Sequence, residues 1–457
     1  MPSAGSSLGV PDAEGAPLRG RVLRPADGAW FLFRPDGGRG ELRVRGAVPG
    51  ERILARPRAG DPGWADLQEI LVPSPARREP PCPAAGRCGG CHWQHMRDGF
   101  QLRLKAERAE TLLAPLRPAA PLEVSPSPLL LGYRWRARFQ VSPGEPPAVG
   151  FHRPGSRATL DLERCPLLSP ALQRIYLAVR ERIRRHPLPG LTGFELSALP
   201  GAAGALLWLN PRDRPPRGWE PWVEPLLRDP DAPVAGAAVR EGRAIRVRGR
   251  ALVTGWSPAG APLAAAAAAF LQANLAAADL LAETVRRYAG AAPGRRIAEL
   301  YAGTGLLSWR CAASGAEVTS VERDPLAVAA ARALPAPPRG LLRPLAGDAG
   351  SAEALLAGAD AVIADPPRSG LGPLAHRLAA GGPGRIVLVS CSLASAARDL
   401  AALASSYALE RAALVDLFPQ TRHVELVCSL VRRTPGRVSA ASSAPGHGVP
   451  DGCGRGG

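Results

Sequence analysis

The chain has 457 residues, of which 46% are hydrophobic, enough for two to four domains with sizeable cores. No apolar run is long enough to cross a bilayer, and residues 1–20 lack a basic stretch followed by an apolar block. We therefore expect a cytoplasmic protein with no membrane partner. Basic residues outnumber acidic ones 57 to 40, for a net charge of +17, which favours a polyanionic partner such as nucleic acid.

The N-terminal part of the chain predicts a tail followed by a small barrel. Residues 1–18 are rich in Gly, Ser, Ala and Pro and are expected to form a disordered tail. Residues 19–74 hold five short strand candidates separated by Gly- and Pro-rich turns, a spacing typical of a small β-barrel. Within them, Val48-Pro49-Gly50-Glu51-Arg52 resembles a turn of the TRAM domain, a small RNA-binding barrel.

Residues 75–262 are predicted to form a mixed α+β central domain that carries a cysteine site. Cys82, Cys88 and Cys91 lie close together in the chain, and Cys165 is the best candidate for a fourth ligand. Eight unevenly spaced cysteines in a chain of this length do not predict a disulfide framework. Thiolates instead select zinc or an iron–sulfur cluster, and the spacing alone does not distinguish the two.

Two basic stretches of this domain allow more than one interpretation. Residues 100–116 have the apolar spacing of an amphipathic helix, with Arg103, Lys105 and Arg108 on an outer face that contacts either solvent or RNA. Residues 133–139 alternate arginine with aromatic or small residues. On a strand, this pattern would place three arginines on one face, either to contact phosphates or simply to face solvent.

Residues 263–433 predict a doubly wound α/β domain, and residues 434–457 a second disordered tail. Five strand candidates each end in a polar residue, and in such sheets ligands bind beyond the carboxyl ends of the strands. The first is followed by Gly303 and Gly305, the next ends in Glu322, and Asp348 and Asp365 follow two more. The E-x-x-x-G-x-G pattern at residues 299–305 is closer to methyltransferases that use S-adenosylmethionine than to dinucleotide-binding proteins.

The fifth strand candidate, Arg385 to Ser390, runs into Cys391. A cysteine at the ligand edge of a sheet is a candidate nucleophile, although most free cysteines are simply small buried apolar residues.

Several stretches together resemble the RNA (uracil-5-)-methyltransferases that carry a TRAM domain and a [4Fe–4S] cluster. They are Cys82-x5-Cys88-Gly-Gly-Cys91 with Cys165, residues 270–274, Asp365-Pro366-Pro367-Arg368, residues 390–392 with 398–400, and Phe418-Pro419-Gln420-Thr421-x-His423-Val424-Glu425. The resemblance covers nearly the whole chain. It implies a monomer that methylates C5 of a uridine in rRNA or tRNA.

The resemblance also implies roles for individual residues. Cys391 would be the nucleophile and Glu425 the general base, because a thiolate that adds to C6 of uracil makes C5 nucleophilic and a carboxylate can then remove the C5 proton. The residues implied to contact S-adenosylmethionine are Gln272, Tyr301, Glu322, Asp348 and Asp365. Cys82, Cys88, Cys91 and Cys165 would hold a [4Fe–4S] cluster rather than zinc.

Two positions depart from the family pattern. Leu306 replaces a polar contact to the cofactor, and Ser392 stands where asparagine commonly follows the nucleophile. Two other functions remain as alternatives: a noncatalytic RNA-binding or chaperone protein that retains the fold, and a cytosine C5-methyltransferase, which the Asp365–Arg368 and Glu425 contexts disfavour.

Overall fold

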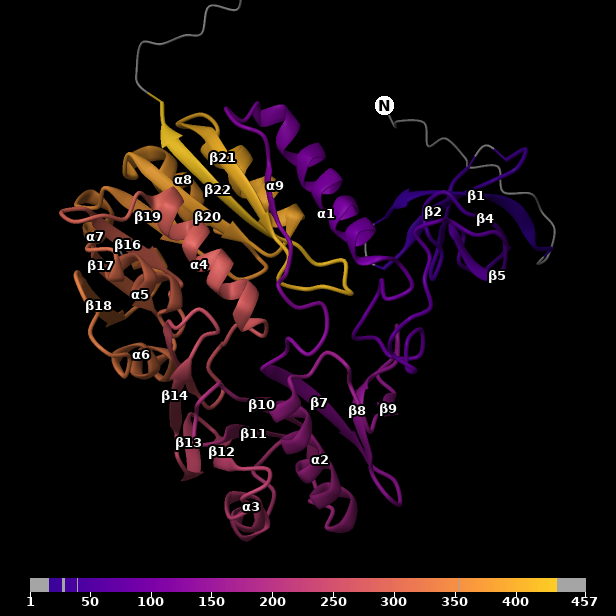
Figure 1. The fold of residues 1–457 in the computed structure, drawn as a ribbon, viewed down its shortest axis with the longest axis horizontal. Helices are drawn as coiled ribbons and strands as arrows, with labels where there is room; N and C mark the ends of the chain where they lie inside the picture. The colour runs from indigo at the N-terminus through magenta and orange to yellow at the C-terminus, as the bar shows by residue number, and fades with distance from the viewer. Residues whose placement is uncertain (1–15, 27–28, 39, 352, 434–457) are drawn as a thin grey trace, which may run out of the picture.

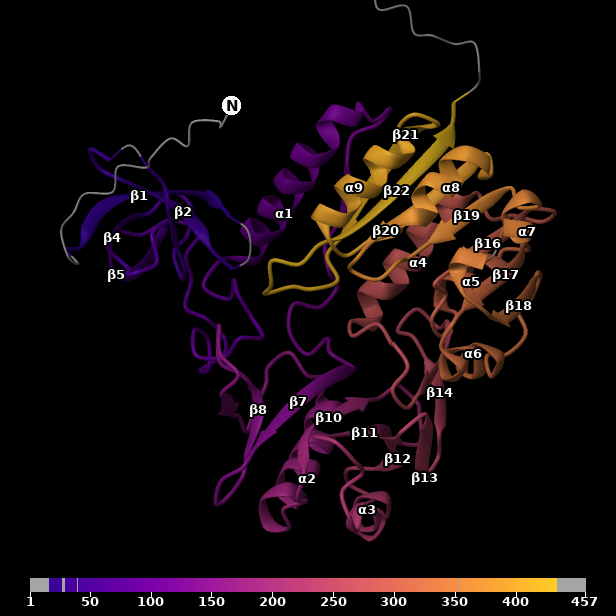
Figure 2. The same ribbon diagram turned by 180° about the vertical axis from the view of Figure 1, so that it is seen from behind.

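The computed structural model describes residues 16–433 except 27–28, 39 and 352, so the two predicted tails lie almost entirely outside the described residues. The chain forms a small barrel, a central sheet and a large C-terminal sheet (Figure 1). Seen from either side, the barrel and the large sheet lie next to each other with helix α1 between them, and the central sheet lies below both (Figures 1 and 2).

The N-terminal barrel is closed, with strand order β1-β2-β3-β5-β4, which confirms the predicted small barrel. Its strands are β1 (Leu18–Pro25), β2 (Phe31–Pro35), β3 (Leu42–Val44), β4 (Arg52–Pro57) and β5 (Trp64–Val72). Alternate apolar side chains such as Phe31 and Phe33 fill its interior. The buried Glu51 carboxylate accepts a bond from Val48 N at 2.8 Å and pairs with Arg77 at 2.5 Å, so the turn at 48–51 ties the barrel to the linker that follows it.

The central domain is a seven-stranded sheet, in the order β13-β12-β11-β10-β7-β8-β9, packed against two helices. Its elements are β7 (Arg136–Ser142), β8 (Ala148–His152), β9 (Thr159–Asp161), α2 (Pro170–Arg185), β10 (Leu191–Ser197), β11 (Ala205–Pro211), α3 (Trp219–Leu227), β12 (Val234–Glu241) and β13 (Ala244–Gly249). A hairpin, β14 (Leu252–Trp256) and β15 (Pro262–Ala266), leads on to the large sheet.

The large sheet has eight strands in the order β18-β17-β16-β19-β20-β22-β21-β6, and β16 to β20 are all parallel. Its elements are β6 (Glu123–Ser125), α4 (Leu275–Ala289), β16 (Arg296–Leu300), α5 (Leu306–Ala313), β17 (Glu317–Glu322), α6 (Pro325–Arg332), β18 (Leu341–Ala346), α7 (Glu353–Ala357), β19 (Ala361–Ala364), α8 (Pro373–Gly381), β20 (Arg385–Ser390), α9 (Leu393–Leu403), β21 (Tyr407–Val415) and β22 (Glu425–Arg432).

Helices cover both faces of the large sheet, as expected for a doubly wound fold. Ile386 and Leu388 of β20 pack with residues of α8 and α9, whereas Val387 and Val389 pack with α4 and α5. Both faces of the strand are therefore buried, which explains its continuous apolar sequence.

Two elements from residues 75–262 join the large sheet instead of the central one. β6 adds a parallel edge strand beside β21, and helix α1 (Asp98–Leu113) places Ala109 and Leu113 in the same apolar cluster as α9. In Figure 1, α1 runs along the side of the sheet that faces the barrel.

The two basic stretches differ from what the sequence led us to expect. Lys105 does not face outward: it is fully buried and pairs with Asp416 at 2.7 Å. Arg136 and Arg138 both pair with Glu195 of β10, at 2.7 and 3.3 Å, and Arg134 precedes strand β7 and is half-buried. The three arginines therefore do not form one face of a strand, because Arg134 lies outside β7 and the other two share the Glu195 carboxylate.

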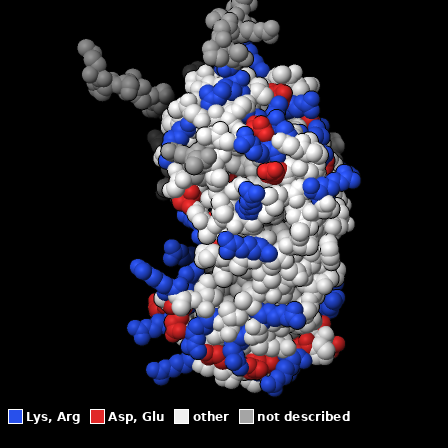
Figure 3. Space-filling model, turned by 90° about the vertical axis from the view of Figure 1, so that its left-hand side faces the viewer, with Lys and Arg blue, Asp and Glu red and all other residues white. Residues whose placement is uncertain are grey.

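Charged side chains are distributed widely on the surface. On the face seen in Figure 3, basic side chains are scattered from top to bottom with acidic ones among them, so this face carries no single continuous basic patch. Within the described residues, no helix is long and apolar enough to span a membrane.

The Lys105–Asp416 pair provides a test of how α1 is anchored. Replacing Lys105 by Met leaves the Asp416 carboxylate buried without its counter-charge. We expect the free energy of unfolding, measured in urea, to fall by about 3–5 kcal/mol. The double variant Lys105→Met/Asp416→Leu removes both charges and should regain most of this loss. Equal stability of the wild type and the single variant would contradict the buried pair.

Candidate active site and four-cysteine cavity

The carboxyl ends of the parallel strands surround one cavity of about 680 Å³. It is lined by every residue that the sequence assigned to catalysis or to cofactor binding in the large domain: Gln272, Tyr301, Glu322, Asp348, Asp365, Cys391 and Glu425. These residues span much of the domain in sequence. They come together because each lies at or near the end of a strand or the start of a helix, and these ends meet at the same edge of the sheet.

One half of the cavity is built on the glycine-containing turn after β16. Tyr301, Gly303 and Gly305 have positive φ angles of 61°, 54° and 86°, so the chain reverses sharply before α5. Gly303 N donates to the Glu322 carboxylate at 3.0 Å, and the other carboxylate oxygen accepts from Asp324 N at 2.8 Å. Glu322 is thus held at the end of β17 with its oxygens facing a close backbone turn, an arrangement suited to a ribose-containing ligand.

Leu306, one of the two departures from the family pattern, does not line this cavity. It is the first residue of α5 and packs against apolar clusters beneath the hairpin and α4. Its apolar side chain therefore contributes to the core.

The other half of the cavity contains Cys391, between the end of β20 and the start of α9. Ser392 is the N-cap of α9, and its side chain accepts a hydrogen bond from Ser395 N at 3.3 Å. Serine and asparagine are comparable N-caps, so Ser392 performs a role that an asparagine could also perform. The partial positive charge of the helix N-terminus favours the thiolate form of the adjacent cysteine.

Charges around the thiol act in opposite directions. Burial raises the pKa of Cys391, the Glu425 carboxylate raises this pKa further, and the Arg368 guanidinium lowers it. Burial and the Asp365 carboxylate hold the pKa of Glu425 well above its usual range, and burial raises the pKa of Asp365 to about 7. Arg368 is therefore the counter-charge that offsets part of this rise in pKa for both the thiol and the Glu425 carboxyl.

Arg368 was missed as a site residue by the sequence analysis, which used it only as part of the Asp365–Arg368 motif. The signal was present in its position directly after Asp365-Pro366-Pro367 at a strand end. Asp399 of α9 fixes this loop by accepting from Leu371 N at 2.9 Å, and Arg398 donates to Ser369 O at 3.2 Å.

A second cavity of about 880 Å³ reaches Cys391 from the side of α1 and the barrel. Four arginines line it, from β1, α1 and the loops near the site: Arg24, Arg108, Arg368 and Arg422. Cys391, Arg368 and His423 line both cavities. The thiol is thus accessible from two sides. One is the cavity lined by the predicted cofactor contacts, and the other is the arginine-lined groove, which suits a polyanion.

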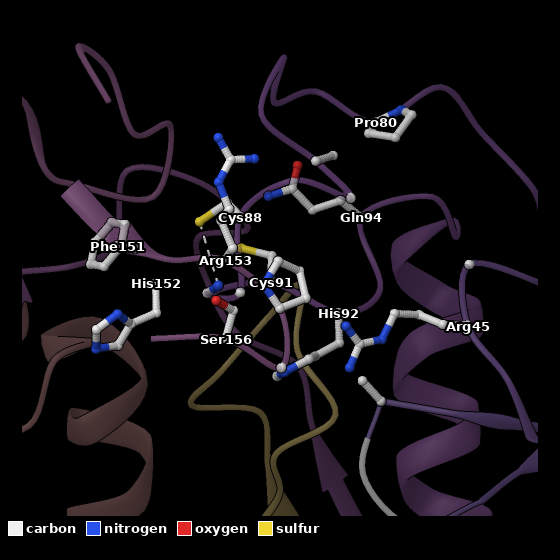
Figure 4. Close-up of a pocket in the computed structure, with 18 of the residues that line it drawn as sticks. Arg45, Pro80, Cys88, Cys91, His92, Gln94, Phe151, His152, Arg153 and Ser156 are labelled. Carbon is white, nitrogen blue, oxygen red and sulfur yellow. Dashed lines mark hydrogen bonds between the residues drawn. The ribbon is translucent and has the colours of Figure 1, made fainter. Parts of the chain in front are cut away.

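The four predicted cysteine ligands also come together. Cys82, Cys88, Cys91 and Cys165 line one small cavity of about 30 Å³. Half-buried Arg134 lines it too, and its buried Nε has no hydrogen-bond partner among the residues that the structure describes. In Figure 4, Cys88 and Cys91 lie between Phe151 and His152 on one side and Arg45 of the barrel on the other.

The donor set of this cavity matches a thiolate-bound metal or cluster in type and number, and the adjacent Arg134 guanidinium suits the negative charge of such a group. The four cysteines share this cavity, but among the described side chains no group of three or more His, Cys, Asp or Glu residues is arranged closely enough to hold a metal ion.

Comparison with known proteins agrees with this geometry. A family model described as tRNA (uracil-5-)-methyltransferase matches residues 357–433. An uncharacterised RNA methyltransferase of Streptomyces avermitilis is 34% identical over 85% of this chain and 92% of its own length. A 23S rRNA (uracil(1939)-C(5))-methyltransferase, RlmD, of Halomonas elongata is 30% identical over 88% of this chain and 87% of its own.

Among solved structures, a tRNA (uracil-54, C5)-methyltransferase of Pyrococcus abyssi in complex with S-adenosyl-L-homocysteine superposes with a TM-score of 0.70. The match covers 91% of this chain and 100% of that one at 22% sequence identity, so it supports the fold. The doubly wound sheet with its edge cavity is that of an α/β methyltransferase. The chain belongs to the RNA (uracil-5-)-methyltransferase family.

The charge arrangement at Cys391 predicts how its thiol titrates. Replacing Arg368 by Gln removes the nearby positive charge, so alkylation of Cys391 by iodoacetamide should need a pH higher by about one unit or more for the same rate. The rate at this residue can be followed by mass spectrometry of the modified peptide. Arg411→Gln is the control, because Arg411 is exposed on β21 and does not line either cavity at the thiol. An unchanged pH profile for Arg368→Gln would contradict the assigned counter-charge.

Proposed function

We propose that this protein methylates C5 of a uridine in rRNA or tRNA through a covalent bond between Cys391 and the base, with S-adenosylmethionine as the methyl donor. The observation that carries the proposal is the position of Cys391, which lines both the cavity of the cofactor-type residues and the arginine-lined groove. The named activities of the relatives and the S-adenosyl-L-homocysteine bound to the structural neighbour support the same reaction.

The thiol of Cys391 starts the reaction. Its sulfur adds to C6 of the uracil ring, and the electron pair of the C5–C6 double bond moves into the enolate at C4, which makes C5 nucleophilic. Arg368 and the N-terminus of α9 favour the thiolate needed for this step. When bound, S-adenosylmethionine supplies an electrophilic methyl group for C5. Glu322 and the turn at Gly303 would hold the ribose end of this donor, and Asp365 would lie between donor and base.

Glu425 completes the reaction by taking the proton from C5. The electron pair of the C5–H bond then re-forms the C5–C6 double bond as the C6–S bond breaks, and the thiolate leaves. The raised pKa of Glu425, caused by burial and by Asp365, makes its carboxylate a stronger base than an exposed one.

The RNA must present the uridine unpaired, because a stacked base conceals both faces of C5 and C6. The groove lined by Arg24, Arg108 and Arg422 extends from the thiol toward the barrel and would hold the flanking backbone. Arginine contacts to phosphate make such binding weaken as the salt concentration rises.

Separate variants test the two chemical steps. We expect Cys391→Ala to abolish both methylation and the covalent adduct with 5-fluorouridine-containing RNA, since the fluorine prevents proton removal and traps the wild-type adduct. Glu425→Gln should instead accumulate a methylated protein–RNA adduct with ordinary RNA, visible on a denaturing gel. Methyl transfer by Cys391→Ala at the wild-type rate would contradict the proposal.

The four-cysteine cavity is proposed to hold a [4Fe–4S] cluster with a structural role. Protein purified without oxygen should contain about four iron and four sulfide per chain, and Cys165→Ala should lose most of both. Cys311→Ala is the control, because Cys311 is buried in the large domain, away from this cavity. Stoichiometric zinc without iron would count against the cluster.

A further inference from the structure

Gln420 occupies a strained and buried position in the loop that leads to Glu425. The loop, residues 416–424, connects β21 to β22, and Glu425 is the first residue of β22. Gln420 is 1% exposed and has a φ of +69°, a left-handed conformation that residues other than glycine rarely adopt. Such a conformation persists only when the surrounding contacts determine it.

The side chain of Gln420 is bonded to three residues that lie more than 300 positions earlier in the chain. Its Nε2 donates to Asp98 Oδ1 at 2.8 Å, and its Oε1 accepts from Arg78 at 2.9 Å and from Gln101 Nε2 at 3.0 Å. Asp98 and Gln101 belong to α1, and Arg78 belongs to the segment that follows the barrel. The side-chain amide therefore connects both of these segments to the loop.

The backbone of Gln420 is bonded to the cysteine loop itself. Its carbonyl oxygen accepts from His92 N at 3.0 Å and from Trp93 N at 3.1 Å. His92 directly follows Cys91, and its ring lies edge-on to that of His423, with 5.7 Å between the ring centroids. Cys91 and Glu425 are thus joined by one short path of backbone and hydrogen bonds.

We propose that Gln420 is a positioning residue that couples the four-cysteine site to Glu425. Ligation that fixes the chain at Cys91 fixes the amides of His92 and Trp93, these hold the Gln420 carbonyl, and the loop then places Glu425 five residues later. This coupling rests on the proposed function, because it assigns Glu425 the removal of the C5 proton. It works in both directions, so loss of the Gln420 bonds also loosens the cysteine loop.

The coupling affects one chemical step more than the others. Cys391 is held by β20 and α9, and neither element forms part of the 416–424 loop. Arg422 and His423 of the loop line the groove, so a loosened loop weakens RNA binding. At saturating RNA, addition to C6 and methyl transfer stay largely intact and removal of the C5 proton slows. A residue that only stabilised the fold would not divide the two steps in this way.

The main test uses Gln420→Gly, which keeps the left-handed backbone available and removes the side chain. With uridine-containing RNA and methyl donor, the methylated protein–RNA adduct should form at nearly the wild-type rate and resolve about tenfold to a hundredfold more slowly. Asn210→Ala is the matched control, because it truncates an amide on β11 of the central sheet that bonds Trp208. It should leave both rates unchanged.

A charge exchange tests the specific bonds. Gln420→Glu alone places a second carboxylate next to that of Asp98. The two negative charges repel each other, so resolution of the adduct should slow. Adding Asp98→Asn restores one donor and one acceptor between the two positions and leaves a carboxylate for Arg78, so the double variant should recover most of the wild-type rate. Recovery distinguishes positioning from a general loss of stability.

Hydrogen exchange provides a readout that does not depend on activity. In the full-length protein, amides of residues 416–424 should exchange faster after removal of the bound metal by a chelator, and Gln420→Gly should lose its metal to the chelator faster than the wild type. If Gln420→Gly resolves the adduct at the wild-type rate, or exchange in 416–424 is the same with and without metal, the coupling is wrong. If the wild type forms no adduct at all, the proposed function itself fails.

Discussion

The common edge at which the parallel strands end is the constraint on which the rest of the structure depends. A parallel sheet must bury both faces, so the only places where its strands can present polar groups to a ligand are the ends. Glu322, Asp348, Asp365 and Cys391 are far apart in sequence, and the order β18-β17-β16-β19-β20 brings them to a single cavity. This strand order is why the residues assigned to the methyl donor lie next to the residues assigned to catalysis.

The same edge creates an electrostatic conflict. Asp365 and Glu425 are two carboxylates in a buried site, and each disfavours ionisation of the other and of Cys391. Arg368 offsets part of this repulsion. A site with raised carboxyl pKa values and one nearby guanidinium can hold a proton briefly and release it, which a fully solvated pair of carboxylates does poorly.

The elements of secondary structure and most of the site were predictable from the sequence because they depend on local pattern. Alternation and glycine spacing gave the barrel, and polar residues at the ends of apolar runs gave the cavity edge. Lys105 was misassigned because its helical position alone does not reveal Asp416, which comes 311 residues later. The partner of Arg136 and Arg138 was not predictable for the same reason, since Glu195 lies on another strand.

Gln420 and Arg134 illustrate a further limit. Both lie in stretches that the sequence analysis singled out, but their own roles were not predictable, because these depend on groups contributed by other parts of the chain. Buried polar residues of this kind are determined by tertiary contacts, which a local pattern does not contain.

The strand β6 has a consequence for how the protein can be divided. It covers the edge of β21, and Glu123 at its start pairs with Arg287 and Tyr288 of α4. A fragment that began after the central sheet would leave β21 as an open strand with unpaired backbone groups and would uncover the apolar surface under α1. Such a fragment would be prone to self-association, so the catalytic half of the chain depends for its solubility on a segment translated long before it.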